Sequence, residues 1–178
     1  EDAPTPVVLM GYLNPIEIHG TRRFAEAAVA AGVDGLLLVD LPPEEAAETR
    51  TIFTEVGLAL IALASPTTSE QRLDMLCSSA QGYLYYVSFA GVTGASNLLD
   101  THAASDRLRQ LRRRAGAPVV AGFGIKDAAS AAAMAVDAEG VVVGSALVAA
   151  LAEATDVRSA RERAEAFLAP LRQALDQA

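Results

Sequence analysis

Six short, continuous apolar runs, each bounded by glycine, proline or aspartate, are the feature that most constrains how this chain can fold. They occupy residues 6–12, 35–40, 58–64, 82–88, 118–123 and 140–144. A strand with one solvated face alternates apolar and polar residues, whereas a strand of a parallel sheet is covered on both faces and stays apolar throughout. The runs therefore predict buried strands of a parallel sheet.

The segments between these runs are typical of helices. Apolar residues recur at three- and four-residue spacing between Phe24 and Gly32, a glycine suited to ending a helix. Pro42-Pro43-Glu44-Glu45 predicts a helix start, because proline fits the first turn and acidic side chains favour the positive end of the helix dipole. Further helices are predicted over residues 69–77, 105–114, 127–136, 146–153 and 157–175.

This alternation of strands and helices predicts the α/β class, built from βαβ units in a single domain over residues 1–178. Six units in 178 residues average about 30 residues each, close to the spacing of a (β/α)₈ barrel of about 250 residues. We therefore expect an incomplete TIM barrel with about six parallel strands, the third to the eighth. A doubly wound open sheet is the alternative; its glycine-rich turn usually follows the first strand, whereas here such turns follow the last strands.

Composition excludes several classes of partner. The chain has 14 basic and 22 acidic side chains, a net charge of −8, which argues against binding to nucleic acid or to an anionic membrane. No apolar run reaches the ~20 residues of a membrane span, and residues 1–4 do not resemble a secretion signal. A single cysteine fits a reducing compartment, so we expect a cytoplasmic protein. With only two histidines, we expect no metal site.

Glycine-rich turns follow the last strands. Gly122-Phe123-Gly124-Ile125 closes the fifth run, and Gly144-Ser145 ends the sixth and opens a predicted helix. Glycines let backbone N–H groups approach a ligand closely, and a helix N-terminus attracts anions. A single glycine pair more often serves only a tight turn. Two such turns on successive final strands favour a phosphate site, since barrels often hold phosphate after strands seven and eight.

Other candidate side chains leave two interpretations open. Asp40 ends a strand on the expected ligand side, where it serves either as a working polar group or as a hydrogen-bond acceptor for the turn at Pro42. Tyr12, Leu37, Leu63 and Tyr85 line either an aromatic ligand pocket or the inner core. Cys77 is expected to be a small core residue, and the arginines between residues 107 and 114 are expected to form a solvated helix face.

Several motifs taken together resemble the tryptophan synthase alpha chain family, in order and in spacing, over essentially all 178 residues. They are Leu9-Met10-Gly11-Tyr12-Leu13-Asn14-Pro15, Asp34-Gly35-Leu36-Leu37-Leu38-Val39-Asp40-Leu41-Pro42, Ser65-Pro66-Thr67-Thr68, Gly91-Val92-Thr93-Gly94, Gly122-Phe123-Gly124-Ile125 and Gly144-Ser145. The most specific pair is Gly-Val-Thr-Gly followed by Gly-Phe-Gly-Ile.

The resemblance implies a (β/α)₈ barrel and a carbon–carbon lyase of tryptophan biosynthesis that cleaves indole-3-glycerol phosphate to indole and glyceraldehyde 3-phosphate. It implies substrate phosphate binding by Gly94, Phe123, Gly124, Gly144 and Ser145. It implies an indole pocket formed by Tyr12, Leu37, Leu63, Tyr85 and Thr93.

The family's proton-transfer residues have no counterpart in residues 1–178. The resemblance places a catalytic glutamate at the end of the second barrel strand and an aspartate in the following loop, and Glu1 and Asp2 match neither motif. No catalytic residue is therefore predicted. Because the reaction needs acid–base groups, we expect this stretch alone to be inactive.

The resemblance also implies the tryptophan synthase beta chain as a partner in a heterotetramer. Pyridoxal phosphate is expected only in that beta chain, so no cofactor is expected here. Two alternatives remain: another phosphate-binding TIM-barrel lyase or isomerase, and a non-catalytic module that binds a phosphate ligand or the beta chain.

Overall fold

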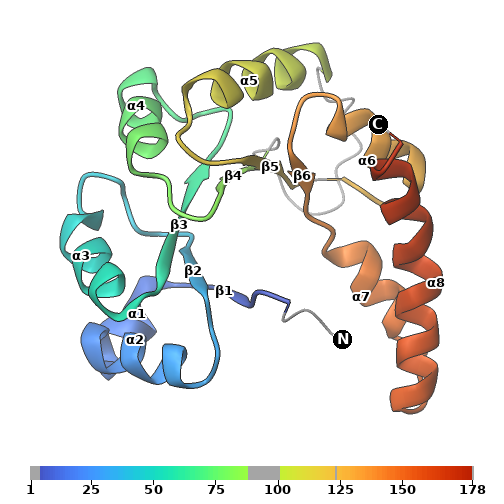
Figure 1. Cartoon of the computed structure of the whole chain (residues 1–178), viewed down its shortest axis with the longest axis horizontal. Coiled ribbons are helices and arrows are strands. Elements are labelled where there is room, and N and C mark those ends of the chain that lie inside the picture. The colour runs from blue at the N-terminus through green and yellow to red at the C-terminus, as the bar shows by residue number, and fades with distance from the viewer. Residues whose placement is uncertain (1–4, 88–100, 123, 178) are drawn as a thin grey trace. The chain divides into compact units, whose positions relative to one another are not determined.

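The computed structural model describes residues 5–87, 101–122 and 124–177, with six strands and eight helices in that part of the chain (Figure 1). The strands are β1 (Val8–Gly11), β2 (Gly35–Leu38), β3 (Ala59–Ala64), β4 (Leu84–Tyr86), β5 (Val119–Ala121) and β6 (Gly140–Val141). The helices are α1 (Leu13–His19), α2 (Thr21–Ala30), α3 (Ala46–Val56), α4 (Glu70–Ser79), α5 (Thr101–Arg114), α6 (Ala128–Ala135), α7 (Ser145–Leu151) and α8 (Val157–Leu175).

The chain divides into two compact units, which are described separately. The first unit comprises Glu1–Tyr85 and Arg114–Ala117, and the second comprises Tyr86–Arg113 and Pro118–Ala178. The expectation of a single domain over residues 1–178 stays a prediction. None of the described helices is both long and apolar enough to cross a membrane.

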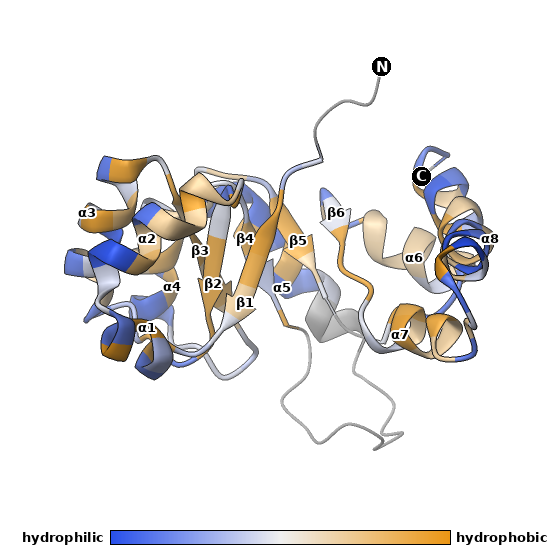
Figure 2. Cartoon of the chain, turned by 90° about the horizontal axis from the view of Figure 1, so that it is seen from below, coloured by the Kyte–Doolittle hydropathy of each residue, from blue (hydrophilic) through white to orange (hydrophobic). Residues whose placement is uncertain are grey.

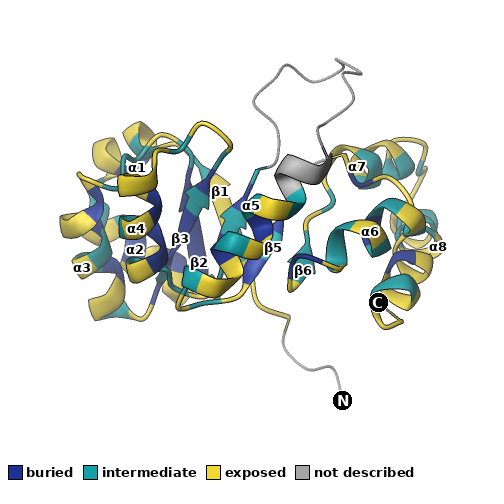
Figure 3. Ribbon diagram, turned by 90° about the horizontal axis from the view of Figure 1, so that it is seen from above, coloured by how far each residue is buried: buried dark blue, intermediate teal, exposed yellow. Residues whose placement is uncertain are grey.

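In the first unit, parallel strands form a sheet with helices against one face (Figure 1). The register places Met10 of β1 opposite Leu37 of β2, and Leu37 opposite Ile61 of β3. The helix-covered face contributes Leu36, Leu38 and other strand residues to a core with Phe53, which is fully buried. Figure 2 shows the apolar colouring concentrated on these strands, and Figure 3 shows them as the buried part of the unit.

The second unit pairs β5 with β6 in parallel and covers them with helices. Val120 lies opposite Gly140, and the backbone N–H of Gly122 donates to the carbonyl of Tyr86 at 3.0 Å. Ile125, Ala131 and Leu171 form a small core in which α6 and α8 meet.

The arginine-rich helix α5 is held by ion pairs within the second unit. The Arg112 Nε donates to Glu139 at 2.6 Å, and the other oxygen of Glu139 accepts the Val119 N–H at 2.7 Å. Arg109 contacts the buried carboxylate of Asp137 at 3.3 Å. Arg109, Arg112 and Arg113 are exposed, as predicted for a solvated helix face, and the ion pairs of Arg109 and Arg112 with acidic residues that follow α6 are an addition that the sequence did not indicate.

Two further details differ from the sequence-based expectations. Residues 42–45 form turns, with the Glu45 N–H donating to the Pro42 carbonyl at 3.0 Å, so α3 begins only at Ala46. Helix α1 was not predicted. It contains Pro15, which is tolerated because the first-turn N–H groups of a helix have no intrahelical partner.

Candidate functional site

An apolar face of the first-unit sheet carries three of the residues predicted to contact indole. Leu37 is only 3% exposed and is in register with Ile61. Leu63 lies two residues beyond Ile61 on the same strand, so strand alternation places it on the same face as Leu37. This face is the one opposite Leu36 and Leu38, which pack against the helices.

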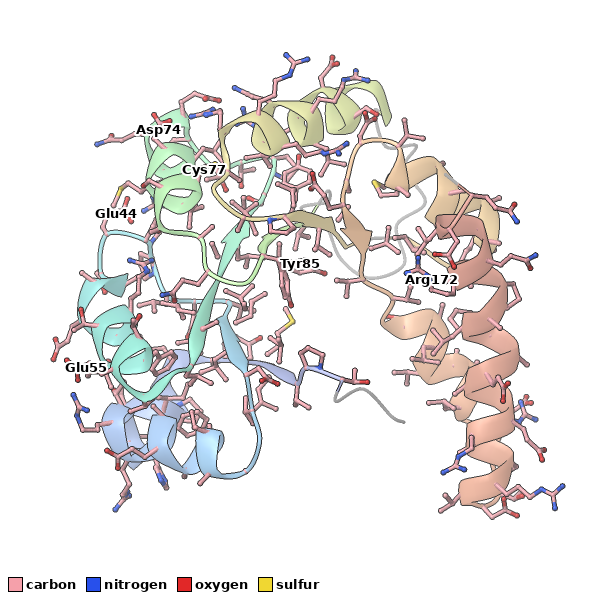
Figure 4. All side chains as sticks on the ribbon, viewed as in Figure 1. Glu44, Glu55, Asp74, Cys77, Tyr85 and Arg172 are labelled. Carbon is pink, nitrogen blue, oxygen red and sulfur yellow. The ribbon has the colours of Figure 1, made fainter. Side chains whose placement is uncertain are left out.

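Tyr85 projects from β4 between two buried neighbours. Leu84 and Tyr86 are 0% and 1% exposed, so Tyr85 points to the opposite face by alternation. Figure 4 shows its side chain on the side of the sheet away from α3 and α4. Burial raises the pKa of the Tyr85 phenol, and the neighbouring Tyr83 adds to the shift. The ring therefore offers a neutral, partly apolar surface at physiological pH.

Tyr12 lies directly after β1, as the residue that precedes α1, and is 65% exposed. It follows Met10 by two residues, which gives it the direction of Met10 rather than that of Leu9 if the strand alternation continues. Asp40, the other candidate polar residue, has a different partner from the one expected. Its Oδ1 accepts a hydrogen bond from the N–H of Leu13 at 2.8 Å. Asp40 thus provides an acceptor for the first backbone N–H of α1, a role that neither of its two predicted interpretations included.

In the second unit, the two glycine turns occupy equivalent positions on paired strands. Ala121 is in register with Val141, and Gly124 and Gly144 each follow by three residues. Gly124 has a φ of +64°, a backbone conformation that residues with a Cβ rarely adopt. No heavy atom lies within 4 Å of the point where a Cβ would be. The backbone at Gly124 is therefore open to approach.

The N-terminus of α7 begins at Ser145 directly after Gly144. Gly144 accepts the Val148 N–H at 3.1 Å through its carbonyl, but no side chain caps the first amides of the helix. By contrast, the neighbouring helix α6 has its first turn occupied by Asp127, whose carboxylate accepts the Ser130 N–H at 2.8 Å. This hydrogen bond lowers the pKa of Asp127. The first amides of α7 thus have no side-chain acceptor at the cap and are available to an external anion, unlike those of α6.

The remaining predicted site residues are Thr93, Gly94 and Phe123, which lie outside the described residues. Cys77 is buried, at 3% exposure, which confirms its predicted place in the core. The sequence analysis did not single out Arg50 and Arg72, which line a cleft beside α3 and α4. No periodicity reveals such residues, because a cleft is formed by elements distant in sequence.

Comparison with known proteins identifies the family. The family model described as tryptophan synthase alpha chain matches residues 1–176. The tryptophan synthase alpha chain of Xanthomonas axonopodis pv. citri is 96% identical over 177 residues, which are 99% of this chain and 66% of that protein. The protein of the same description from Xanthomonas campestris pv. campestris (strain B100) is 89% identical over 176 residues. The chain thus spans slightly less than two thirds of the length of these curated relatives.

Solved structures agree with this result. The crystal structure of tryptophan synthase subunit alpha from Legionella pneumophila matches 99% of this chain and 65% of its own, with a TM-score of 0.85 and 42% identity. A structure of the tryptophan synthase α2β2 complex from Pyrococcus furiosus matches 95% of this chain and 67% of its own, with a TM-score of 0.81 and 38% identity. Together with the parallel strands, these matches confirm the predicted incomplete (β/α)₈ barrel.

Proposed function

The chain belongs to the tryptophan synthase alpha chain family, and on that premise we propose that its protein cleaves indole-3-glycerol phosphate to indole and glyceraldehyde 3-phosphate. The observation that carries the proposal is the family match over residues 1–176, within which the glycine turns and the apolar sheet face both fall. The reaction class is that of a carbon–carbon lyase.

We assign the phosphate of the substrate to the glycine turns that follow β5 and β6. The start of α7 at Ser145, which has no side-chain cap, and the backbone at Gly124, where no Cβ is present, are the proposed sources of N–H donors. Gly94 and Phe123 complete the set that the family resemblance implies. Backbone donors of this kind favour a doubly charged phosphate because they bring partial positive charge and require no counter-ion.

We assign the indole ring to the apolar residues Leu37 and Leu63 and the aromatic Tyr85. Leu37 and Leu63 offer aliphatic surface, and Tyr85 offers an aromatic ring. Tyr12 and Thr93 belong to the same set by resemblance. An apolar surface with a few aromatic side chains suits a flat heteroaromatic ring, for which edge and stacking contacts add to the hydrophobic gain.

In this proposal, residues 1–178 supply binding and not proton transfer. The carboxylates that the family resemblance implies match no position of the stretch, so the acid–base steps belong to other residues of the protein. We propose no cofactor for this chain. The α2β2 complex named for the Pyrococcus furiosus relative supports a beta chain as partner, and pyridoxal phosphate would reside there. The acidic composition and single buried cysteine favour the cytoplasm.

The proposal is tested by indole release from indole-3-glycerol phosphate, with the full-length protein and the beta chain present. We expect Gly124→Ala to raise KM by about tenfold or more, because the Cβ strains a turn that presents donors to the phosphate. Gly32→Ala is the matched control, since Gly32 also has a positive φ, +86°, and open space around it, but lies outside the predicted site. Absence of indole release by the unmodified protein, with phosphate-ligand binding intact, would refute the lyase assignment.

A further inference from the structure

A cleft of about 300 Å³ opens in the first unit between α3 and α4. Its floor is the helix-covered face of the sheet, where Leu38 and Ala62 lie, and its sides carry Arg50 from α3 and Arg72 from α4. A volume of this size is at the lower end of the range for small-molecule pockets. Apart from Leu63, the cleft shares no residue with the predicted phosphate and indole sets.

Arg50 is the unusual residue of this cleft. Its Nε is buried, and no residue in the described part of the chain accepts a hydrogen bond from it. A buried guanidinium donor without an acceptor is unfavourable, and natural proteins rarely leave one. A ligand with acceptor oxygens in the cleft would give this guanidinium the hydrogen-bond acceptor that the described residues do not supply.

The charges that line the cleft favour an anion. Arg72 donates from Nε to Glu44 at 2.7 Å, and Arg50 adds a second positive charge. The carboxylate in the lining, Asp40, is engaged by the N–H of Leu13. Because Arg72 is paired with Glu44, Arg50 is the guanidinium of the lining for which the described residues offer no carboxylate partner. The planar guanidinium matches the geometry of a carboxylate better than that of a neutral group.

The rest of the lining defines the body of the ligand. Hydroxyl groups of Ser65 and Thr68 lie 3.2 Å apart at the carboxyl end of β3 and line the cleft near its polar part. The floor at Leu38 and Ala62 is aliphatic. The cleft thus has polar groups, among them the guanidinium of Arg50, on one side and aliphatic groups on the other.

We propose that this cleft binds a small carboxylate with a short apolar body. The carboxylate is held by Arg50 with Arg72 beside it, and the apolar body lies against Leu38 and Ala62. This site does not depend on the proposed lyase function, because its ligand group is a carboxylate and its positive charge comes from side chains rather than backbone amides.

The test is a titration of the full-length protein with hexanoate, hexan-1-ol and inorganic phosphate, followed by nuclear magnetic resonance of the Leu38 and Ala62 amides and the Arg50 Nε–H. We expect saturable shifts at these three groups with hexanoate, and affinities at least about tenfold lower for hexan-1-ol and for phosphate. Equal affinity for hexanoate and hexan-1-ol, or no saturable shift at these groups with hexanoate, would overturn the proposal.

Variants separate the site from a general charge effect. Arg50→Gln is expected to weaken hexanoate binding by about tenfold or more, and Arg50→Lys by less, because it keeps the charge but not the planar fork. Arg23→Gln removes the same charge from an exposed position of α2 and is expected to change the affinity less than about twofold. Equal losses in Arg50→Gln and Arg23→Gln would contradict the assignment. Should Arg50→Gln fail to fold, the comparison of hexanoate with hexan-1-ol on the unmodified protein decides.

Discussion

Single residues in this chain are constrained mostly by neighbours far away in sequence. Asp40 is the clearest case, since its carboxylate accepts the N–H of Leu13, which lies 27 residues earlier. Gly35 is another. A Cβ at this position would lie 3.3 Å from the Ala59 carbonyl oxygen and 3.3 Å from the Ile61 side chain. The close approach of β2 to β3 therefore depends on the missing side chain of Gly35.

At this scale we predict that Gly35→Ala destabilises the protein. The backbone oxygen of Ala59 cannot yield without disturbing the strand pairing, so we expect a loss of about 1–3 kcal/mol in the free energy of unfolding. Gly116→Ala is the control, because the nearest atom to its Cβ lies at an ordinary 3.8 Å. Urea unfolding of the full-length protein measures both. A change of the same size in the two variants would disprove the packing argument.

Two helices of the second unit, α6 and α8, begin with capping boxes. At the start of α8, the Asp156 carboxylate accepts a hydrogen bond from the Ser159 N–H at 2.7 Å, and the Ser159 hydroxyl accepts one from the Asp156 N–H at 3.1 Å. The same box of Asp127 and Ser130 begins α6. The capping hydrogen bond from the Ser159 backbone lowers the pKa of Asp156 below its usual 3.8. The ionised cap thus stabilises the folded state more than the protonated one does.

Because the folded state lowers the pKa of Asp156, the free energy of unfolding is expected to depend on pH through this residue. The contribution of the Asp156 charge is present above the unfolded value and is lost as the pH falls through the lower folded value. Asp156→Asn keeps a capping oxygen but does not titrate. We expect the stability advantage of the unmodified protein over Asp156→Asn to shrink between about pH 6 and about pH 3.5. Urea unfolding at the two pH values measures it, and an advantage that is equal at both would argue against the charged cap.

The accuracy of the sequence analysis also differs by element. Residues 157–175 were predicted as a helix and form α8 with the same bounds, because an Asp cap and an amphipathic pattern lie within one segment. The strands are shorter than the apolar runs, since the ends of each run turn toward a loop. Helix α3 begins later than its prolines suggested, because the N–H groups of Glu45 and Ala46 bond to the carbonyls of Pro42 and Pro43 in turns.

For the whole molecule, the α/β fold class and the glycine turns could be predicted because each depends on residues that are close together in the sequence. The partners of Asp40, the ion pairs of α5 and the cleft at Arg50 could not, because each joins segments that only the folded chain brings together. The indole set was predicted from resemblance and placed by strand alternation. Leu37 and Leu63 share a face through the register of β2 with β3, and Tyr85 is placed by the alternation of buried neighbours in β4.

The first strand supports a prediction about residues 1–178 as an isolated polypeptide. Leu9 and Met10 are 41% and 62% exposed, and β1 pairs with β2 while no other described strand pairs with its second edge. Exposed apolar strand edges promote association. We expect this polypeptide to sediment as oligomers, and Met10→Lys to reduce the association. A monodisperse monomer at about 100 µM, a concentration typical for detecting weak association, would contradict this.

The proposed function depends most on the binding of the substrate phosphate by backbone amides that follow β5 and β6. The direct measurement is a titration of the full-length protein with glyceraldehyde 3-phosphate, observed through the amide resonances of Gly124, Gly144 and Ser145. We predict saturable shifts at all three that share one affinity. Shifts confined to other parts of the chain, or none at these residues at saturation, would contradict the central claim.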